Sequence, residues 1–135
     1  MDAHHTVEDT GICIGQALNR ALGEKRGIAR SGHAYLPMDE ALAFAALDLC
    51  GRDYLVFEGD FAAPRCGGMD TQLCREFFRA VCQRAGLTAH LRILYGENDH
   101  HKMEALFKAF GKALAQAATL DPRVEDVHST KGVLA

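Results

Sequence analysis

The sequence contains the pattern His-His-x-x-Glu twice, and the residues that follow each copy also agree. The first copy begins at His4 and the second at His100. At the same offset four further pairs coincide: Gly15 with Gly111, Ala17 with Ala113, Leu18 with Leu114, and Ala21 with Ala117. Because both segments place apolar residues at helical spacing, each motif is predicted to open a long amphipathic helix. The chain is therefore predicted to contain a duplicated α/β unit.

Helix geometry predicts which side chains of a motif meet. Residues four apart lie on one face of a helix, so the first histidine of each copy is expected beside the glutamate of that copy. The second histidine points about 100° away around the helix. The order differs from the His-Glu-x-x-His of zinc hydrolases, which argues against that class. Two such units form a ligand set for two divalent metal ions: His4, His5, Glu8, His100, His101 and Glu104.

The segment before the second motif reads as a complete α/β unit. The expected elements are a strand at 54–61, a loop at 62–68, a helix from Asp70 or Thr71 to about Arg84 that Gly86 ends, a strand at 87–95, and a motif helix capped by Asn98 or Asp99. Residues 34–36 and 41–49 are expected to be extended. Residues 40–46 have equal helix propensity, but the flanking Pro37 and the Cys50-Gly51 turn favour a strand.

The first motif has no comparable lead-in, because only three residues precede His4. We therefore expect an incomplete first repeat, with residues 1–27 as its remainder and residues 28–135 as the second repeat with a C-terminal tail. On this interpretation Met1 is not the natural start. The absence of a preceding strand would leave one edge of the sheet unpaired.

The composition indicates a single globular domain over residues 1–135. The hydrophobic share is 48%, the charged share is 24%, and the net charge is -3, so neither nucleic acid nor a membrane is an expected partner. No run reaches the roughly 20 apolar residues of a membrane span, and no signal peptide is recognised. Five cysteines without a Cys-x-x-Cys pair are expected to be reduced and structural, as in a cytoplasmic protein.

Several stretches resemble the imidazoleglycerol-phosphate dehydratase family, in order along the whole chain. These stretches are residues 4–11, 21–23, 27–30, 39–42, 48–52, 76–78, 96–101, 107–110 and 129–132. The resemblance implies an α/β (α+β) fold in which a duplicated β-α-β-type unit layers helices on a sheet, as in ribosomal protein S5 domain 2-like folds. It also implies that an N-terminal part of the family, with another metal-binding histidine and a catalytic glutamate, has no counterpart here.

The resemblance further implies an activity in histidine biosynthesis. The family dehydrates imidazole glycerol phosphate to imidazole acetol phosphate, with two Mn²⁺ ions per active site, in a shell of 24 subunits whose sites form between chains. Coordination of the substrate imidazole would stabilise an imidazolate-like intermediate and so make the elimination feasible. The alternative from another class is an inactive fragment, or a non-catalytic metal-binding assembly protein, of the same fold.

Site residues follow from matched positions in the family. Glu76 becomes a further metal ligand, and Glu104 and Glu8 become candidate catalytic proton carriers. A dianionic phosphate needs several donors, and the matching positions are Arg30, Arg52, Lys108, Ser129 and Lys131. A lone histidine is ordinarily a surface or core residue, so we assign no role to His33, His90 and His128.

Overall fold

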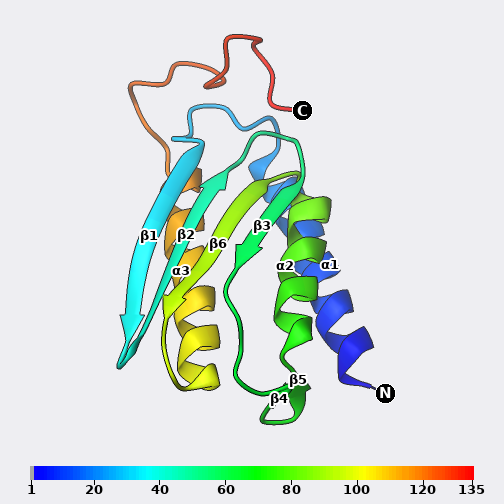
Figure 1. Cartoon of the computed structure of the whole chain (residues 1–135). Coiled ribbons are helices and arrows are strands. Elements are labelled where there is room, and N and C mark those ends of the chain that lie inside the picture. Colours follow the sequence, from blue (N-terminus) through cyan, green and yellow to red (C-terminus); the bar gives the residue numbers. More distant parts are fainter. Residues whose placement is uncertain (1) are drawn as a thin grey trace.

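A four-stranded sheet covered by helices on one face forms the body of the protein (Figure 1). The computed structural model describes residues 2–135. Its helices are α1 (Ala3–Leu22), α2 (Gln72–Ala85) and α3 (Asp99–Ala118). Its strands are β1 (Ser31–Met38), β2 (Ala41–Asp48), β3 (Tyr54–Glu58), β4 (Arg65–Cys66), β5 (Met69–Asp70) and β6 (Thr88–Tyr95). This mixed α/β architecture, with helices layered on a sheet, confirms the predicted fold class.

The sheet has the strand order β1-β2-β6-β3. β1 pairs antiparallel with β2, β2 pairs antiparallel with β6, and β3 pairs parallel with β6. The strand interpretation is confirmed for residues 41–46, because β2 is hydrogen-bonded to a neighbour on each side, while Glu40 lies in the turn before it. Its Ala43, Ala45 and Leu47 are buried under the helices, while Phe44 faces the opposite side against Tyr35. Small alanines on the helix-facing side let α3 approach β1 and β2 closely.

The three helices share one direction but pack differently. α3 lies on β1 and β2, and α2 contacts β3, while α1 packs along α2 rather than on the four strands. Gly11 and Gly15, one turn apart, lie directly against α2. An added Cβ at Gly11 would lie 2.8 Å from the Phe77 carbonyl oxygen, and one at Gly15 would lie 2.6 Å from the Arg84 Cβ. The buried core is therefore made mainly by α2, α3 and the sheet.

Several predicted boundaries shift in the structure. The third strand ends at Glu58 instead of residue 61, and the predicted loop contains the short β4–β5 hairpin. At the start of α2, the Asp70 carboxylate accepts the Gln72 N–H at 2.9 Å, whereas the Thr71 hydroxyl donates to carbonyls of the preceding loop. The division into repeats at residues 27 and 28 stays a prediction.

The segment after α3 runs across the end of the sheet where β1 begins (Figure 1). It is tied down by single bridges from Val127 to Arg26 and from Leu120 to Ile28. The buried Lys25 ammonium donates to the Leu134 carbonyl at 3.0 Å. These contacts fix the tail beside the beginning of β1. Within residues 2–135, no helix combines the length and apolar character needed to cross a membrane.

Candidate metal and phosphate sites

Both motifs place a histidine and a glutamate side by side on the first turns of a helix. His4 Nε2 lies 3.2 Å from Glu8 Oε2 on α1, and His100 Nε2 lies 3.0 Å from Glu104 Oε2 on α3. This confirms the pairing expected from the spacing of four. All four side chains keep solvent access, from 32% to 69% of their surface. They are therefore available to an ion that approaches from outside the subunit.

The two helix starts are built in the same way. The Asp2 carboxylate caps α1 and accepts the backbone N–H of His5 at 2.9 Å, and the Asn98 side chain caps α3 and accepts that of His101 at 3.0 Å. Each cap satisfies an otherwise free N–H of the first turn. Asn98 was one of the two predicted caps of α3, while the cap by Asp2 was not predicted.

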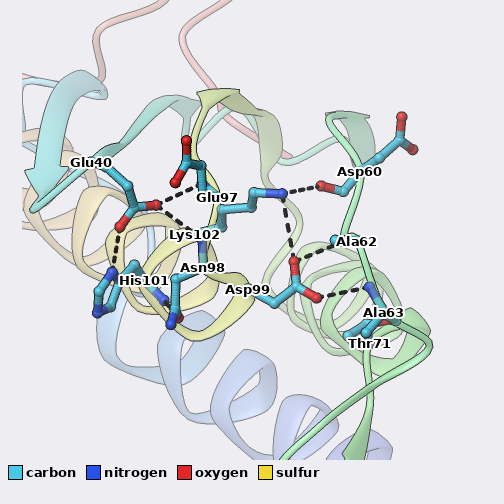
Figure 2. Close-up of polar contacts among 10 residues, drawn as sticks. All are labelled: Glu40, Asp60, Ala62, Ala63, Thr71, Glu97, Asn98, Asp99, His101 and Lys102. Atoms are coloured by element: carbon cyan, nitrogen blue, oxygen red, sulfur yellow. Dashed lines mark hydrogen bonds and ion pairs between the residues drawn. The ribbon is translucent and has the colours of Figure 1, made fainter.

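The second histidine of each motif turns its Nδ1 to a carboxylate. His5 Nδ1 lies 3.2 Å from Asp2 Oδ2, and His101 Nδ1 lies 2.5 Å from Glu40 Oε1 (Figure 2). The hydrogen bond from His101, followed by the backbone N–H groups of Asn98 and Glu97, lowers the pKa of Glu40 to about 2. The same bond raises the pKa of His101. Glu40 is a site residue that the sequence analysis missed.

Glu104 joins His100 to Lys108 along one face of α3. Lys108 Nζ lies 2.8 Å from Glu104 Oε1, while the other carboxylate oxygen, Oε2, contacts His100. The pKa of Glu104 is lowered, first by the bond from Lys108 and then by His100. The Glu104 side chain is thus held ionised, which suits a metal ligand or a proton acceptor.

The donor chemistry of the motifs fits a divalent ion such as Mn²⁺. Imidazole nitrogens and carboxylate oxygens are the available donors, with no thiolate among them. Within residues 2–135, however, the fold brings no three His, Cys, Asp or Glu side chains together in a metal-binding arrangement. Each motif therefore offers a pair of ligands, and the predicted ligands of α1 and α3 do not converge on one point within the subunit.

Glu76 stands apart from both motifs, half-buried on the second turn of α2. It lines a recess of about 460 Å³ between this helix and the loop that follows β3. The guanidinium of Arg75 lies 5.0 Å above the Phe57 ring at the same recess. Glu76 is thus placed beside a cavity, but the described residues give it no histidine partner.

A network at the start of α3 ties that loop to the second motif (Figure 2). Asp99 accepts the N–H groups of Ala62 at 2.8 Å and Ala63 at 2.9 Å. The buried Lys102 ammonium donates to the Asp60 carbonyl at 3.2 Å and lies 3.5 Å from Asp99. Burial opposes ionisation of Asp99, but the two N–H donors and Lys102 outweigh it and lower its pKa. The loop beside Glu76 is therefore held against the helix that begins with His100.

Four of the five predicted phosphate-binding residues surround one recess of about 730 Å³: Arg30, Arg52, Ser129 and Lys131. Arg30 is held there by Asp48, with Nε to Oδ1 at 2.7 Å and Nη2 to Oδ2 at 3.1 Å. That bond raises the pKa of Arg30. Arg30 Nη1 also donates to the His128 carbonyl at 2.9 Å. The recess therefore combines Arg30, which Asp48 holds in place, with the further cationic groups of Arg52 and Lys131, which suits a phosphate.

The metal motifs and the phosphate recess lie at opposite ends of the subunit. α1 and α3 begin at one end, while the recess is formed at the other end by the beginning of β1 and the C-terminal segment (Figure 1). Lys108 lies on α3 with Glu104, away from the recess. Of the unassigned histidines, His33 and His90 lie on β1 and β6, and His128 Nδ1 lies 3.4 Å from the Ala29 carbonyl.

Comparison with known proteins identifies one family. The model of the family described as imidazoleglycerol-phosphate dehydratase matches residues 1–114. An imidazoleglycerol-phosphate dehydratase of Listeria welshimeri is 57% identical over 134 residues, covering 99% of this chain and 69% of that protein. One from Symbiobacterium thermophilum is 58% identical, covering 99% of this chain and 64% of that protein.

Solved structures of the same kind share the fold. The crystal structure of imidazoleglycerol-phosphate dehydratase from Staphylococcus aureus superposes with a TM-score of 0.85 at 45% identity, covering 89% of this chain and 71% of that chain. The Pyrococcus furiosus structure gives a TM-score of 0.84 at 38% identity, covering 97% of this chain and 71% of that chain.

Proposed function

The chain belongs to the imidazoleglycerol-phosphate dehydratase family, and we propose that it catalyses the dehydration of imidazole glycerol phosphate to imidazole acetol phosphate in histidine biosynthesis. The observation that carries the proposal is the pair of matched helix starts, each with a histidine 3.0–3.2 Å from a glutamate. Family membership supplies the reaction, and these side chains supply groups able to perform it.

We propose that two Mn²⁺ ions serve each active site. Their ligands would come from both motifs and from Glu76. When bound, the ions would provide positive charge that stabilises negative charge developing on the substrate imidazole. Mn²⁺ takes more ligands than the histidine–glutamate pair of one motif. Because the motifs do not converge within the subunit, the missing ligands are assigned to neighbouring copies, as in a homo-oligomer of 24 subunits.

Proton transfer is assigned to the carboxylates of the motifs. The reaction removes a proton from carbon and releases a hydroxyl group, so it needs a base and an acid. Glu104 is held ionised by Lys108 and His100 and is suited to accept the proton. Glu8, paired with His4, has the same place in the first motif and is the second candidate.

Substrate phosphate is assigned to the recess lined by Arg30, Arg52, Ser129 and Lys131. Asp48 orients the Arg30 guanidinium by accepting from Nε and Nη2, and Arg30 Nη1 donates to the His128 carbonyl. Because this recess lies at the end of the subunit opposite the motifs, phosphate and metal ligands of one active site would come from different chains. Lys108 belongs to the motif end, where its half-exposed ammonium contacts Glu104 and keeps further N–H donors for the substrate.

The five cysteines are free thiols in residues 2–135. Free thiols persist in the reducing cytoplasm, so we also propose that the protein works there.

The test is turnover of imidazole glycerol phosphate in Mn²⁺ buffer by the purified chain joined to the family's N-terminal part, which supplies the further histidine and the catalytic glutamate. We expect product formation that is lost on chelation and in the double variant His100→Ala with His101→Ala. The mass of the assembly, measured in parallel, should fall in the double variant. Mn²⁺ binding without turnover would instead favour a non-catalytic metal-binding protein, and turnover by the double variant would contradict the site.

A further inference from the structure

The hairpin between β1 and β2 delivers an acidic side chain to the start of α3. Met38 pairs with Ala41, so only Asp39 and Glu40 form the turn. Asp39 has a φ of 49°, the left-handed conformation that short hairpin turns require. This backbone aims the Glu40 carboxylate at the first turn of α3, although the two segments are far apart in the sequence.

Both oxygens of Glu40 are engaged there (Figure 2). Oε2 accepts the backbone N–H of Glu97 at 2.6 Å and that of Asn98 at 3.0 Å. Oε1 faces His101 Nδ1 at 2.5 Å. The Glu40 side chain is 34% exposed and that of His101 is 26% exposed, so the contact is partly shielded from water. The hairpin carboxylate therefore orients the imidazole, while the Asn98 cap holds the backbone N–H of His101.

This arrangement determines which ring nitrogen carries the proton. An ionised carboxylate only accepts hydrogen bonds, so His101 Nδ1 must be the donor. A neutral imidazole with its proton on Nδ1 has its lone pair on Nε2. The nearest carboxylate to Nε2 is that of Asp39, at 3.6 Å and 77% exposed, which is beyond hydrogen-bond distance. Nε2 is thus left free to bind an ion.

We propose that Glu40 is a positioning residue that fixes His101 with its proton on Nδ1 and presents Nε2 as a metal ligand. The inference rests on the proposed function, because it concerns a ligand of the proposed Mn²⁺ site. Carboxylates that hold the second nitrogen of a metal-binding histidine commonly orient the ring and strengthen the ligand. Asp2 makes the corresponding contact with His5 in the first motif, but in a more exposed setting.

Glu40→Gln is the informative variant because it keeps the shape of the side chain. Its amide oxygen can replace Oε2 and still accept the two backbone N–H groups, so the helix start is retained. Its NH₂ group would then face His101 Nδ1, which must become the acceptor. The proton is expected to move to Nε2, the nitrogen that the metal needs. Glu97→Gln is the matched control, because it removes a carboxylate one residue from the same cap while the exposed Glu97 side chain has no described polar contact.

The first measurement uses metal-free protein, at a pH of about 9 where histidine is neutral. Long-range ¹H–¹⁵N spectra of the imidazole rings report the protonated nitrogen, and the His101 signal is the one missing in His101→Ala. We expect Nδ1–H in the wild type and in Glu97→Gln, and Nε2–H in Glu40→Gln. A wild-type His101 with its proton on Nε2, or a Glu40→Gln ring unchanged from wild type, would overturn the proposal.

The second measurement is Mn²⁺ binding, followed by electron paramagnetic resonance of the free ion. Glu40→Gln should weaken the affinity by about ten- to a hundredfold, and Glu97→Gln should stay within about twofold of the wild type. Equal affinities of wild type and Glu40→Gln would refute the positioning role. Failure of the wild type to bind Mn²⁺ would refute the proposed metal function, while the spectra would still decide whether Glu40 orients the ring.

Discussion

Alanine at Gly15 and at Gly111 should change stability in opposite directions, although the two glycines occupy matching positions of the predicted repeat. Gly15 lies between α1 and α2, where an added Cβ would meet Arg84 Cβ at 2.6 Å and the Val81 carbonyl oxygen at 2.8 Å. Gly111 is exposed on α3, and an added Cβ there would have no neighbour within 4 Å. The two substitutions therefore share the change in helix propensity and differ in the change in packing.

The shared term is helix propensity, which favours alanine over glycine by about 1 kcal/mol. Gly111→Ala should show this gain alone and raise the free energy of unfolding by about 1 kcal/mol. Gly15→Ala adds an overpacking cost of about 1–3 kcal/mol. The upper end applies because a backbone oxygen and a Cβ cannot rotate away, so Gly15→Ala should lower the free energy of unfolding by about 2 kcal/mol after the gain is subtracted.

Urea unfolding followed by circular dichroism measures both changes. The variants are compared at one protein concentration, since association would otherwise change the apparent stability. The two midpoints should fall on opposite sides of the wild-type midpoint. A Gly15→Ala protein as stable as Gly111→Ala would show that α1 does not approach α2 at Gly15, and the placement of the first motif would be wrong.

Three further predictions concern other parts of the fold. Burial raises the pKa of Cys74 and Cys82 to about 12. At pH 8 a thiol reagent should therefore label the exposed Cys13 and spare these two. Mass spectrometry that shows labelled Cys74 or Cys82 in the folded chain would contradict their burial in the core. Lys102→Met should lower the free energy of unfolding by about 1–3 kcal/mol, because it removes a buried hydrogen bond to the loop after β3. Hydrogen exchange of that loop should accelerate. Unchanged exchange would show that Lys102 does not hold the loop. The pKa of Glu40 is lowered from 4.5 to about 2, so its stabilisation is complete above pH 4.5 and is lost as the pH falls toward 2. Glu40→Gln should therefore flatten the dependence of the free energy of unfolding on pH in that window. The same slope in the wild type and in Glu40→Gln would show that Glu40 is not the cause of the pH dependence.

Local patterns in the sequence predicted most of the secondary structure. The cap at Asn98, the helix end at Gly86 and the 3.6-residue spacing of apolar side chains are all signals within a few residues, and each has its counterpart in the structure. The boundary of β3 was less predictable, because the aromatic Phe61 follows Gly59 and Asp60 and extends the strand-like pattern, although the strand already ends at Glu58. Residues 40–46 were ambiguous because alanine fits both helices and strands, and only pairing with β1 and β6 decides between them.

Residue spacing alone predicted the site only where its residues are close in sequence, whereas the distant residues of the phosphate recess came from the family resemblance. The histidine–glutamate pairs follow from a spacing of four on one helix face. Glu40 has no such signal, since its contact with His101 depends on how a hairpin is placed against a distant helix. The contact of Asp48 with Arg30 depends in the same way on the pairing of β1 with β2.

The number of Mn²⁺ ions bound per chain tests most directly whether the two motifs build shared sites. It can be measured by metal analysis of wild type, of His4→Ala with His5→Ala, and of His100→Ala with His101→Ala. If each ion takes ligands from both motifs, either double variant should lose nearly all bound Mn²⁺. Retention of half the wild-type Mn²⁺ in each double variant would show two independent sites and would contradict the account.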